Sequence, residues 1–316
     1  MAMTIFEIIA AALLDGLLGE PRRWHPLVGF GVLAQRLEKW LNPGASSGPG
    51  TSAAARGYFG GVLAVLTAVA PPVLALWALD RYTYIAPLLA IGFLYLVIGH
   101  RSLHEHAIAV ERALRSGDLT EARRRVGAIV SRDASDMDAQ RIAGATVESL
   151  LENGNDALFG ALFWFLLTGV PGALAYRLIN TLDAMWGYRT EHYRRFGWAA
   201  ARLDDLMNFL PARLTAFSYA VVGHAGIALR CWRLQAPAWD SPNAGPVMAS
   251  GAGALHIRLG GGAFYHGRWH ERSTLGEGRP ADLGDISRAR RLVVRAMLVW
   301  IGAAALIVLV GRSFRA

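Results

Sequence analysis

Residues 60–79 read GGVLAVLTAVAPPVLALWAL, twenty positions without one charged side chain. About 20 mostly apolar residues in a helix cross a bilayer core that is roughly 30 Å thick, so this stretch predicts a membrane-spanning helix. A second uncharged stretch, residues 83–99, follows after only three residues. The short interval predicts that the two stretches form a helical hairpin in the membrane. Residues 295–311 are a third candidate, because no charge follows their first position.

Three other apolar stretches contain polar residues or helix breakers. Residues 5–19 include two carboxylates, and a carboxylate at the bilayer centre costs on the order of 2.5–3.5 kcal/mol. We therefore expect this helix to be short or to face protein, with Asp15 as a candidate functional residue. Residues 157–176 are interrupted by Pro171-Gly172, and residues 212–229 contain an arginine and a histidine. We expect each of these two either to span the bilayer or to enter it and return.

The composition excludes several classes of protein. The 316 residues are 53% hydrophobic and only 18% charged, and this much apolar surface excludes a disordered chain. The single cysteine, Cys231, excludes a disulfide scaffold. The net charge of +8 comes from 31 arginines and one lysine that are spread along the chain. We therefore expect lipid headgroups or a phosphorylated substrate as partners, and no nucleic acid.

These patterns predict an all-α fold without a strand-rich block: one integral membrane domain over residues 1–316, a polytopic helical bundle with re-entrant or broken helices. Eight arginines lie in residues 101–141. Because basic residues mark cytoplasmic loops, we expect all polar segments after residue 100 to share the cytoplasmic face. Residues 42–55, rich in Gly, Ser and Pro, predict a flexible linker. Residues 102–156 predict a cytoplasmic helical segment, whose first two amphipathic helices meet near a capping Asp118.

Common nucleotide and metal motifs are missing from the sequence. A P-loop is excluded because the chain has one lysine and no G-x-x-x-x-G-K-[ST]. No HExxH or CxxC supports a zinc site. The run Gly260-Gly261-Gly262 has no expected strand before it, which argues against a dinucleotide-binding loop. Any nucleotide must therefore be held by other residues.

Polar residues nevertheless gather at the ends of the apolar stretches. Asp15, Glu20 and His25 lie where Gly and Pro are expected to end the first helix. Helix capping is the alternative role for these three side chains. Further on, Asp133 of the sequence Ser131-Arg132-Asp133 is expected to cap a helix over residues 134–153.

We expect an acidic face on that helix. Glu148, Glu152 and Asp156 are spaced i, i+4, i+8, which places three carboxylates on one side, with Asn153 beside them. Carboxylate oxygens in this number suit Mg²⁺, which usually bridges to phosphates. The alternative is an ordinary solvated face.

Two later segments supply carboxylates, amides and arginines next to apolar sequence. Such groups are costly to bury unpaired, so we expect them to bind substrate or one another. On a helix Asp204 and Asn208 share a face, and Asn243 stands in the turn-forming sequence Ser-Pro-Asn-Ala-Gly. The candidates are Asn180, Asp183, Arg189, Asp204, Asp205, Asn208, Arg213 and Asn243.

In this order the motifs resemble the adenosylcobinamide-phosphate synthase family of cobalamin biosynthesis (CobD/CbiB). The matching pieces are DGLLGEPRRWHPLVGFG at 15–31, SRD at 131–133, ESLLEN at 148–153, PGALAYRLINTLDAMWGYRTEHYRRFGWAAARLDDLMNFLPARLTA at 171–216 and SPNAGPVMASGAGALHIRLGG at 241–261. The resemblance covers most of the chain. The chain departs from the family pattern at Ala134, Ala161 and Ala184, where the family usually has threonine, proline and serine.

The resemblance implies an ATP-dependent amide ligase that joins adenosylcobyric acid, a corrinoid, to the amine of an amino-alcohol phosphate such as aminopropanol phosphate. ATP and Mg²⁺ are the implied cosubstrate and metal. The implied setting is a multi-pass protein of the bacterial inner membrane with its active site facing the cytoplasm, surrounded by lipid and accompanied by other cobalamin-biosynthesis enzymes.

The resemblance also assigns roles to the candidate residues. The implied metal ligands are Glu148, Glu152 and Asp156. The implied catalytic residues are Glu148, Glu152, Asp183, Asp204 and Asp205. The implied substrate-binding and phosphate-binding residues are Asp15, Glu20, His25, Arg132, Asp133, Asn153, Asn180, Arg189, Asn208, Arg213 and Asn243.

Two other classes of protein stay open at this point. One is a non-catalytic membrane scaffold or an AmpE-like regulatory membrane protein, which the three alanines favour and the retained acidic and amide residues oppose. The other is a transporter with Asp15 on its path, although no inverted repeat is visible. A strain that cannot make cobinamide and is fed cobyric acid separates these classes, because a ligase would rescue its growth and a scaffold or a transporter would not.

Overall fold

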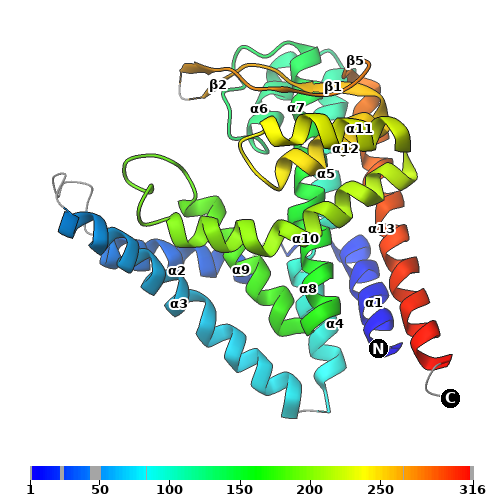
Figure 1. The fold of residues 1–316 in the computed structure, drawn as a ribbon. Coiled ribbons are helices and arrows are strands. Elements are labelled where there is room, and N and C mark those ends of the chain that lie inside the picture. The colour runs from blue at the N-terminus through cyan, green and yellow to red at the C-terminus, as the bar shows by residue number, and fades with distance from the viewer. Residues whose placement is uncertain (1, 22–24, 43–50, 83, 266, 314–316) are drawn as a thin grey trace. The chain divides into compact units, whose positions relative to one another are not determined.

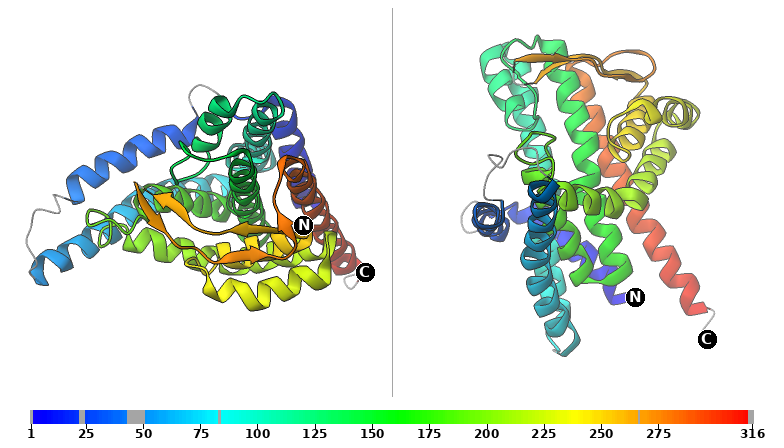
Figure 2. Two further views of the ribbon diagram at one scale, coloured as in Figure 1. Left: turned by 90° about the horizontal axis from the view of Figure 1, so that it is seen from above. Right: turned by 60° about the vertical axis from the view of Figure 1, so that its left-hand side comes forward.

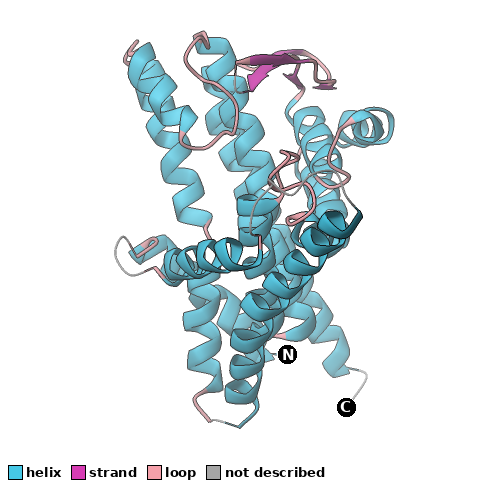
Figure 3. Cartoon of the chain, turned by 90° about the vertical axis from the view of Figure 1, so that its left-hand side faces the viewer, coloured by secondary structure: helices cyan, strands magenta, loops and turns pink. Residues whose placement is uncertain are grey.

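The computed structural model describes the chain except residues 1, 22–24, 43–50, 83, 266 and 314–316. The chain divides into two compact units. Unit 1 comprises Met3–Ile98 and Gly160–Asn208, and unit 2 comprises Gly99–Phe159 and Phe209–Ala316. Most of the described residues are helical (Figures 1 and 3). Of the expected linker over residues 42–55, residues 43–50 lie outside the described part of the chain, and a helix begins at Thr51.

Unit 1 is built from helices. They are α1 (Ala2–Leu18), α2 (Pro26–Leu41), α3 (Thr51–Tyr82), α4 (Ala86–Val97), α8 (Gly160–Thr168), α9 (Val170–Trp186) and the first part of α10 (Trp198–Val222). The core lies among α2, α3, α9 and the segment that leads into α10, and the indole of Trp186 is fully buried there against Phe196. Small residues such as Ala34 and Ala64 let the helices approach one another.

The helix α3 contains the apolar stretch that was expected to cross the membrane. Along it Leu66, Leu74 and Trp77 are 57%, 62% and 47% exposed. Large apolar side chains in such a row lie more favourably in lipid than in water. Two described segments, Ala55–Arg81 and Ala86–Arg115, are helical, long and apolar enough to cross a membrane. Both stretches of the expected hairpin are therefore largely helical, as α3 and α4, which supports a membrane protein.

The third expected membrane stretch lies in α13 (Leu283–Ser313), which exposes Leu306 and Ile307. Among the described residues, this helix is not one of the two segments that are long and apolar enough to cross a membrane. Two candidate spans are thus found among the described residues, and the polytopic bundle stays a prediction.

The first helix faces protein, as expected from its carboxylate. In α1 the side chains of Ile8, Ala11 and Asp15 are buried on one face, whereas Leu13 and Leu17 are exposed on the other. The spacing of three and four residues explains why these three share a face. Asp15 is 0% exposed.

The stretch 157–176 is a helix, a break and a second helix. The break falls at Gly169, whose φ of 74° lies in the region that favours glycine, and Pro171 then stands in the first turn of α9. The helices α8 and α9 pack against each other, and a methyl group at Gly160 would overlap the ring of Tyr176. Since α8 is roughly 14 Å long, it is too short to cross a bilayer alone.

Unit 2 combines helices with short strands. Its helical elements are α5 (His100–Arg115), α6 (Leu119–Gly127), α7 (Ala139–Gly154), the π-helical turn η1 (Asn155–Phe159), the rest of α10, α11 (Ala225–Gln235), the 3₁₀ turn η2 (Ala236–Ala238), α12 (Ala244–Leu255) and α13. Figure 2 shows α5, α7 and α13 side by side, and all three contact one another. The expected pair α5 and α6 is confirmed, and Asp118 caps α6 by accepting a hydrogen bond from Glu121 N (2.9 Å).

The expectation of an all-α fold is wrong for residues 257–280. There β1 (Ile257–Gly260) lies between β4 (Thr274–Gly276), which is antiparallel to it, and β5 (Arg279–Pro280), which is parallel. A separate hairpin pairs β2 (Ala263–Tyr265) with β3 (Arg268–His270) (Figure 3). These strands have two to four residues, too few for alternation along the sequence to be recognised. The glycine run 260–262 therefore does follow a strand.

The expected helix over residues 134–153 begins later than predicted. The helix α7 starts at Ala139, and its N-cap is Asp138, whose Oδ1 accepts a hydrogen bond from Arg141 N (2.8 Å). Asp133 therefore does not cap this helix. Both aspartates suit an N-cap chemically, and the sequence does not decide between them.

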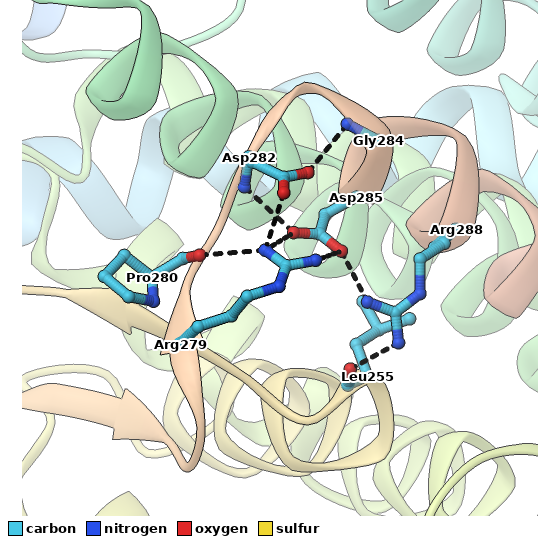
Figure 4. A network of polar contacts seen from close by, with 7 residues as sticks. All are labelled: Leu255, Arg279, Pro280, Asp282, Gly284, Asp285 and Arg288. Atoms are coloured by element: carbon cyan, nitrogen blue, oxygen red, sulfur yellow. Dashed lines mark hydrogen bonds and ion pairs between the residues drawn. The ribbon is translucent and has the colours of Figure 1, made fainter.

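A buried carboxylate joins β5 to the start of α13 (Figure 4). Asp285 is 0% exposed, and it accepts hydrogen bonds from Arg279 Nη1 and Nη2 (2.7 and 3.1 Å) and from Arg288 Nη1 (2.5 Å). Arg288 also donates to Leu255 O (2.6 Å), and Asp282 N donates to Asp285 (2.9 Å). Burial alone would raise the pKa of Asp285, but its donors hold the pKa below the usual value.

Replacing Asp285 by asparagine is expected to destabilise the fold by about 1–3 kcal/mol, because hydrogen bonds to a buried carboxylate are lost while both guanidinium groups keep access to water. Because the pKa of Asp285 is lowered by folding, its stabilisation is present at neutral pH and is lost as the pH falls below about 4. Melting of the detergent-solubilised chain measures both effects. Asp282→Asn is the control, since Asp282 pairs with Arg279 at a half-exposed position; an equal loss in both variants would contradict the prediction.

Candidate functional site

Unit 2 contains a cavity of about 450 Å³, a volume within the range of small-molecule sites. Its walls come from the loop before α7, from the first three turns of α7, from β1 with the glycine run, and from the hairpin β2–β3. The charged lining residues are Arg132, Asp133, Asp136, Asp138, Arg141, Glu148 and Arg258. The sequence analysis singled out three of these, Arg132, Asp133 and Glu148, and the structure brings them together.

Two arginines converge on one buried carboxylate at this cavity. Glu148 Oε2 accepts hydrogen bonds from Arg132 Nη2 (2.8 Å) and Arg272 Nη2 (2.9 Å), and Glu148 Oε1 accepts one from Gly260 N (2.8 Å). Burial alone would raise the pKa of Glu148, but the two guanidinium groups and the Gly260 N–H hold it below its usual value. Glu148 therefore stays ionised, and the three side chains together carry a net charge of +1.

Glu152 lies one turn further along α7. Burial raises the pKa of Glu152, and the charge of Glu148 raises it further, against the opposing charges of Arg272 and Arg132. The two carboxylates therefore differ: Glu148 is anchored as an anion, whereas Glu152 is biased toward its neutral form. Over the whole charged lining, three arginines face four carboxylates, so positive charge is concentrated locally, at the arginines around Glu148 and at the exposed Arg141 and Arg258.

The three carboxylates expected to hold Mg²⁺ are not assembled as a metal site. Glu148 is engaged by two arginines, and Asp156 lies in the π-helical turn, where it accepts a hydrogen bond from Asn155 Nδ2 (2.9 Å). Glu148 and Glu152 lie in α7, whereas Asp156 lies in the π-helical turn that continues it. Among the described residues, no group of three His, Cys, Asp or Glu side chains is arranged to hold a metal ion.

Asp133 connects the loop before α7 to the hairpin. Its backbone N–H donates to Phe264 O (2.9 Å), and its Oδ2 accepts a hydrogen bond from Gly267 N (2.9 Å). Asp133 therefore holds both β2 and the turn of the hairpin, rather than the helix it was expected to cap. Its neighbour Arg132 reaches the carboxylate of Glu148.

Unit 1 holds a second polar group, made from α9 and α10. Asp204 accepts hydrogen bonds from Asn180 Nδ2 and Asn208 Nδ2 (both 3.1 Å), and Asn208 Oδ1 accepts one from Tyr176 Oη (2.9 Å). Asn180, Asp204 and Asn208 were all expected to be site residues. The expectation that Asp204 and Asn208 share a helix face is confirmed.

Asp183 adds an unusual acid–base property to this group. Burial, and then the charges of Asp204 and Asp205, raise the pKa of Asp183 to about 7. Burial also raises the pKa of Asp205, while Arg202 and Arg189 oppose that shift. A carboxyl group whose pKa lies near neutrality can exchange a proton under cellular conditions.

The other expected site residues have contacts of their own within their units. In unit 1, Asp15 is buried in α1, Glu20 is exposed, and His25 caps α2 by accepting a hydrogen bond from Leu27 N (3.2 Å). In unit 2, Asn153 donates to Ser149 O (2.9 Å), and Arg213 donates to Asn243 Oδ1 (2.8 Å) while its guanidinium lies over the ring of Phe209.

The comparisons with known proteins agree with the motifs. A family model described as CobD/CbiB protein matches residues 8–293. The chain is 57% identical over 290 residues to the cobalamin biosynthesis protein CobD of Chromobacterium violaceum, covering 92% of each chain. It is 54% identical over 301 residues to that of Stutzerimonas stutzeri (95% of this chain, 96% of the relative) and 38% identical to that of Mycobacterium tuberculosis. The chain belongs to the CobD/CbiB family. No solved structure matches it.

In this CobD/CbiB family member, sequence reasoning missed several residues of the cavity. Arg258 precedes the glycine run, Phe264 and Trp269 come from the hairpin, and Arg272, outside the lining, pairs with the lining residue Glu148. The run Gly260-Gly261-Gly262 was the available signal, because Gly260 and Gly261 have φ of 82° and 80°, values that other residues rarely adopt. The signal was set aside because no strand was expected before it.

Proposed function

We propose that this CobD/CbiB protein is an ATP-dependent amide ligase that joins adenosylcobyric acid to an amino-alcohol phosphate, such as aminopropanol phosphate, to give adenosylcobinamide phosphate. Family membership and the names of the relatives support a role in cobalamin biosynthesis. The observation that carries the finer proposal is the cavity of unit 2, whose volume suits a small ligand and whose lining brings together the guanidinium groups of Arg132, Arg141 and Arg258.

The reaction needs an activated carboxylate. A carboxylate oxygen of the corrinoid attacks the γ-phosphorus of ATP, ADP leaves, and an acyl phosphate forms. The amine nitrogen then attacks the carbonyl carbon, inorganic phosphate leaves with the C–O bond electrons, and the amine gives up a proton to a base. Both steps develop negative charge on oxygen, which arginine side chains and backbone N–H groups stabilise when they are held in place beforehand.

The cavity offers groups for the phosphates. Arg132 is held by its bond to Glu148, and Arg258 and Arg141 stand exposed on the lining. Mg²⁺ fits as an ion bound mainly to the nucleotide phosphates, since it usually takes one or two protein carboxylates, and Asp136 and Asp138 line the cavity. Bound there, Mg²⁺ would neutralise phosphate charge.

The aspartates of unit 1 are suited to bind and deprotonate the amine of the amino-alcohol phosphate. An ammonium group is attracted to Asp204 and Asp205, and it must lose a proton before its nitrogen can attack. Asp183, with a pKa of about 7, is proposed as the base that accepts this proton. The hydrogen bonds from Asn180 and Asn208 keep Asp204 in a fixed orientation beside it.

We further propose that the chain is a multi-pass protein of the bacterial inner membrane whose chemistry faces the cytoplasm, where ATP is available. The two apolar helical segments and the row of exposed leucines on α3 support membrane insertion. Membrane lipid is then a partner, and other enzymes that use the same corrinoid substrates are candidates for association.

The proposal is tested with membranes that contain the full chain. Adenosylcobyric acid, aminopropanol phosphate, ATP and Mg²⁺ are added, and mass spectrometry follows the corrinoid while ADP and phosphate are measured. We expect one amide product for each ATP consumed, and no product when ATP or the amine is left out. Absence of both product and ADP formation would refute the ligase and leave the scaffold or AmpE-like role.

A further inference from the structure

We infer that the indole ring of Trp269 receives the nucleobase of a nucleotide in the cavity of unit 2. This inference rests on the proposed function, because ATP is the nucleotide concerned. The phosphate side of the cavity does not by itself distinguish ATP from an inorganic phosphate or from the amino-alcohol phosphate. The aromatic side chains of the hairpin β2–β3 make this distinction, because among these three ligands only ATP has a ring that can stack on them.

The indole is held in place by three neighbours. Its ring lies against the backbone of Gly262, where a methyl group would overlap the six-membered ring. Phe264, directly opposite Trp269 in the hairpin, meets it edge to face, with ring centroids 5.1 Å apart. The indole Nε1 donates to Glu271 Oε2 (3.0 Å). These contacts restrain the orientation of the ring before any ligand arrives.

This restrained ring is nevertheless exposed. Trp269 is 49% exposed and Phe264 is 44% exposed, and they are the two aromatic residues among the described lining of the cavity. Two adjacent exposed rings on the wall of a cavity offer a ligand a flat apolar surface on which to stack. Since the rest of the lining carries many charged side chains and glycine backbone, the aromatic pair is not part of an apolar core.

A stacking ring and anion-binding groups in one cavity match the two ends of a nucleotide. Stacking of a nucleobase on an aromatic side chain contributes about 1–3 kcal/mol, and arginines with backbone N–H groups bind phosphates. The volume of about 450 Å³ suits a nucleotide, whereas a corrin ring with its side chains is far larger. Asp133 keeps the hairpin attached to the loop that carries Arg132.

The test compares two probes on the detergent-solubilised full chain by calorimetry: MgATP, which has a ring, and magnesium tripolyphosphate, which has none. We expect Trp269→Ala to weaken MgATP binding by on the order of tenfold to a hundredfold and to leave tripolyphosphate binding unchanged. Trp269→Phe should retain most of the affinity for MgATP. Gly262→Ala, which displaces the indole without removing it, should resemble Trp269→Ala.

The control is Trp198→Ala, which removes a similarly exposed tryptophan from unit 1; it should bind both probes as the parent chain does. Equal losses for both probes in Trp269→Ala, or an unchanged affinity for MgATP, would overturn the stacking role while leaving the nucleotide site standing. If the parent chain binds neither probe, the proposed nucleotide site and this inference both fail. The unchanged tripolyphosphate affinity of Trp269→Ala also shows that this variant is folded.

Discussion

Asp183→Asn is expected to lower the rate of amide formation at pH 7 by on the order of a hundredfold to ten-thousandfold, the usual contribution of a positioned base. Asparagine has nearly the same shape but accepts no proton. In the parent chain, the rate should rise as the pH rises through about 7, because Asp183 must be ionised to act as the base and its pKa is about 7. This rise should be absent from the residual activity of the variant.

The same substitution should make the fold more stable at high pH. The pKa of Asp183 is raised by folding, so the neutral form is favoured, and the associated stability is lost as the pH rises through about 7. Above that pH three aspartates repel one another, and removing one charge should stabilise the fold by on the order of 1–3 kcal/mol. Lower activity together with a higher melting temperature would separate a functional role from a structural one.

The matched control for Asp183→Asn is Glu191→Gln, which removes one exposed carboxylate from the same unit. It should change neither the pH profile nor the melting temperature. The prediction is contradicted if Asp183→Asn keeps the parent rate, or if its activity still rises through pH 7.

Arg132→Met is the second substitution for which we expect a large effect. Arg132 and Glu148 form a pair at 2.8 Å whose side chains are 9% and 8% exposed. Removing one partner of a buried pair costs about 3–5 kcal/mol, although Arg272 still contacts the carboxylate. The net charge of the three side chains falls from +1 to zero, so tripolyphosphate affinity should fall by at least tenfold. Thermal melting and calorimetry measure the two effects.

Loss of stability and loss of binding can be separated with a further variant. Replacing all three side chains (Arg132→Met, Glu148→Leu and Arg272→Met) removes the buried charges together, which is often neutral or stabilising. We expect this variant to recover the melting temperature but not the affinity for tripolyphosphate. Arg141→Met is the stability control, since Arg141 is exposed on the same cavity. Recovery of both properties in the triple variant would show that Arg132 is only structural.

Much of the helical structure was predictable because its causes are local. The apolar run of residues 60–79 is long enough to identify α3, and Gly and Asp around Asp118 identify the junction of α5 and α6. The burial of Asp15 follows from the cost of a carboxylate in lipid. The grouping of Asn180, Asp204 and Asn208 was predictable in part, because two of them are one helical turn apart.

The rest depends on interactions between distant residues. Arg132 and Arg272 are far apart in sequence, and nothing local indicates that both reach Glu148. The strands of residues 257–280 are set by glycine conformations and by pairing with one another, rather than by a long alternating pattern. The π-helical turn that contains Asp156 was likewise not expected from the sequence.

The two attachments of Asp133 have a consequence for ligand selection. This residue ties the segment bearing a cationic phosphate-binding side chain to the hairpin bearing the indole, through Phe264 O and Gly267 N. The phosphate-binding arginine and the indole are therefore held at a fixed separation. This separation has to match the distance between the base and the phosphates of the ligand. A nucleotide whose base and phosphates are farther apart or closer together would contact either the indole or the arginine, but not both.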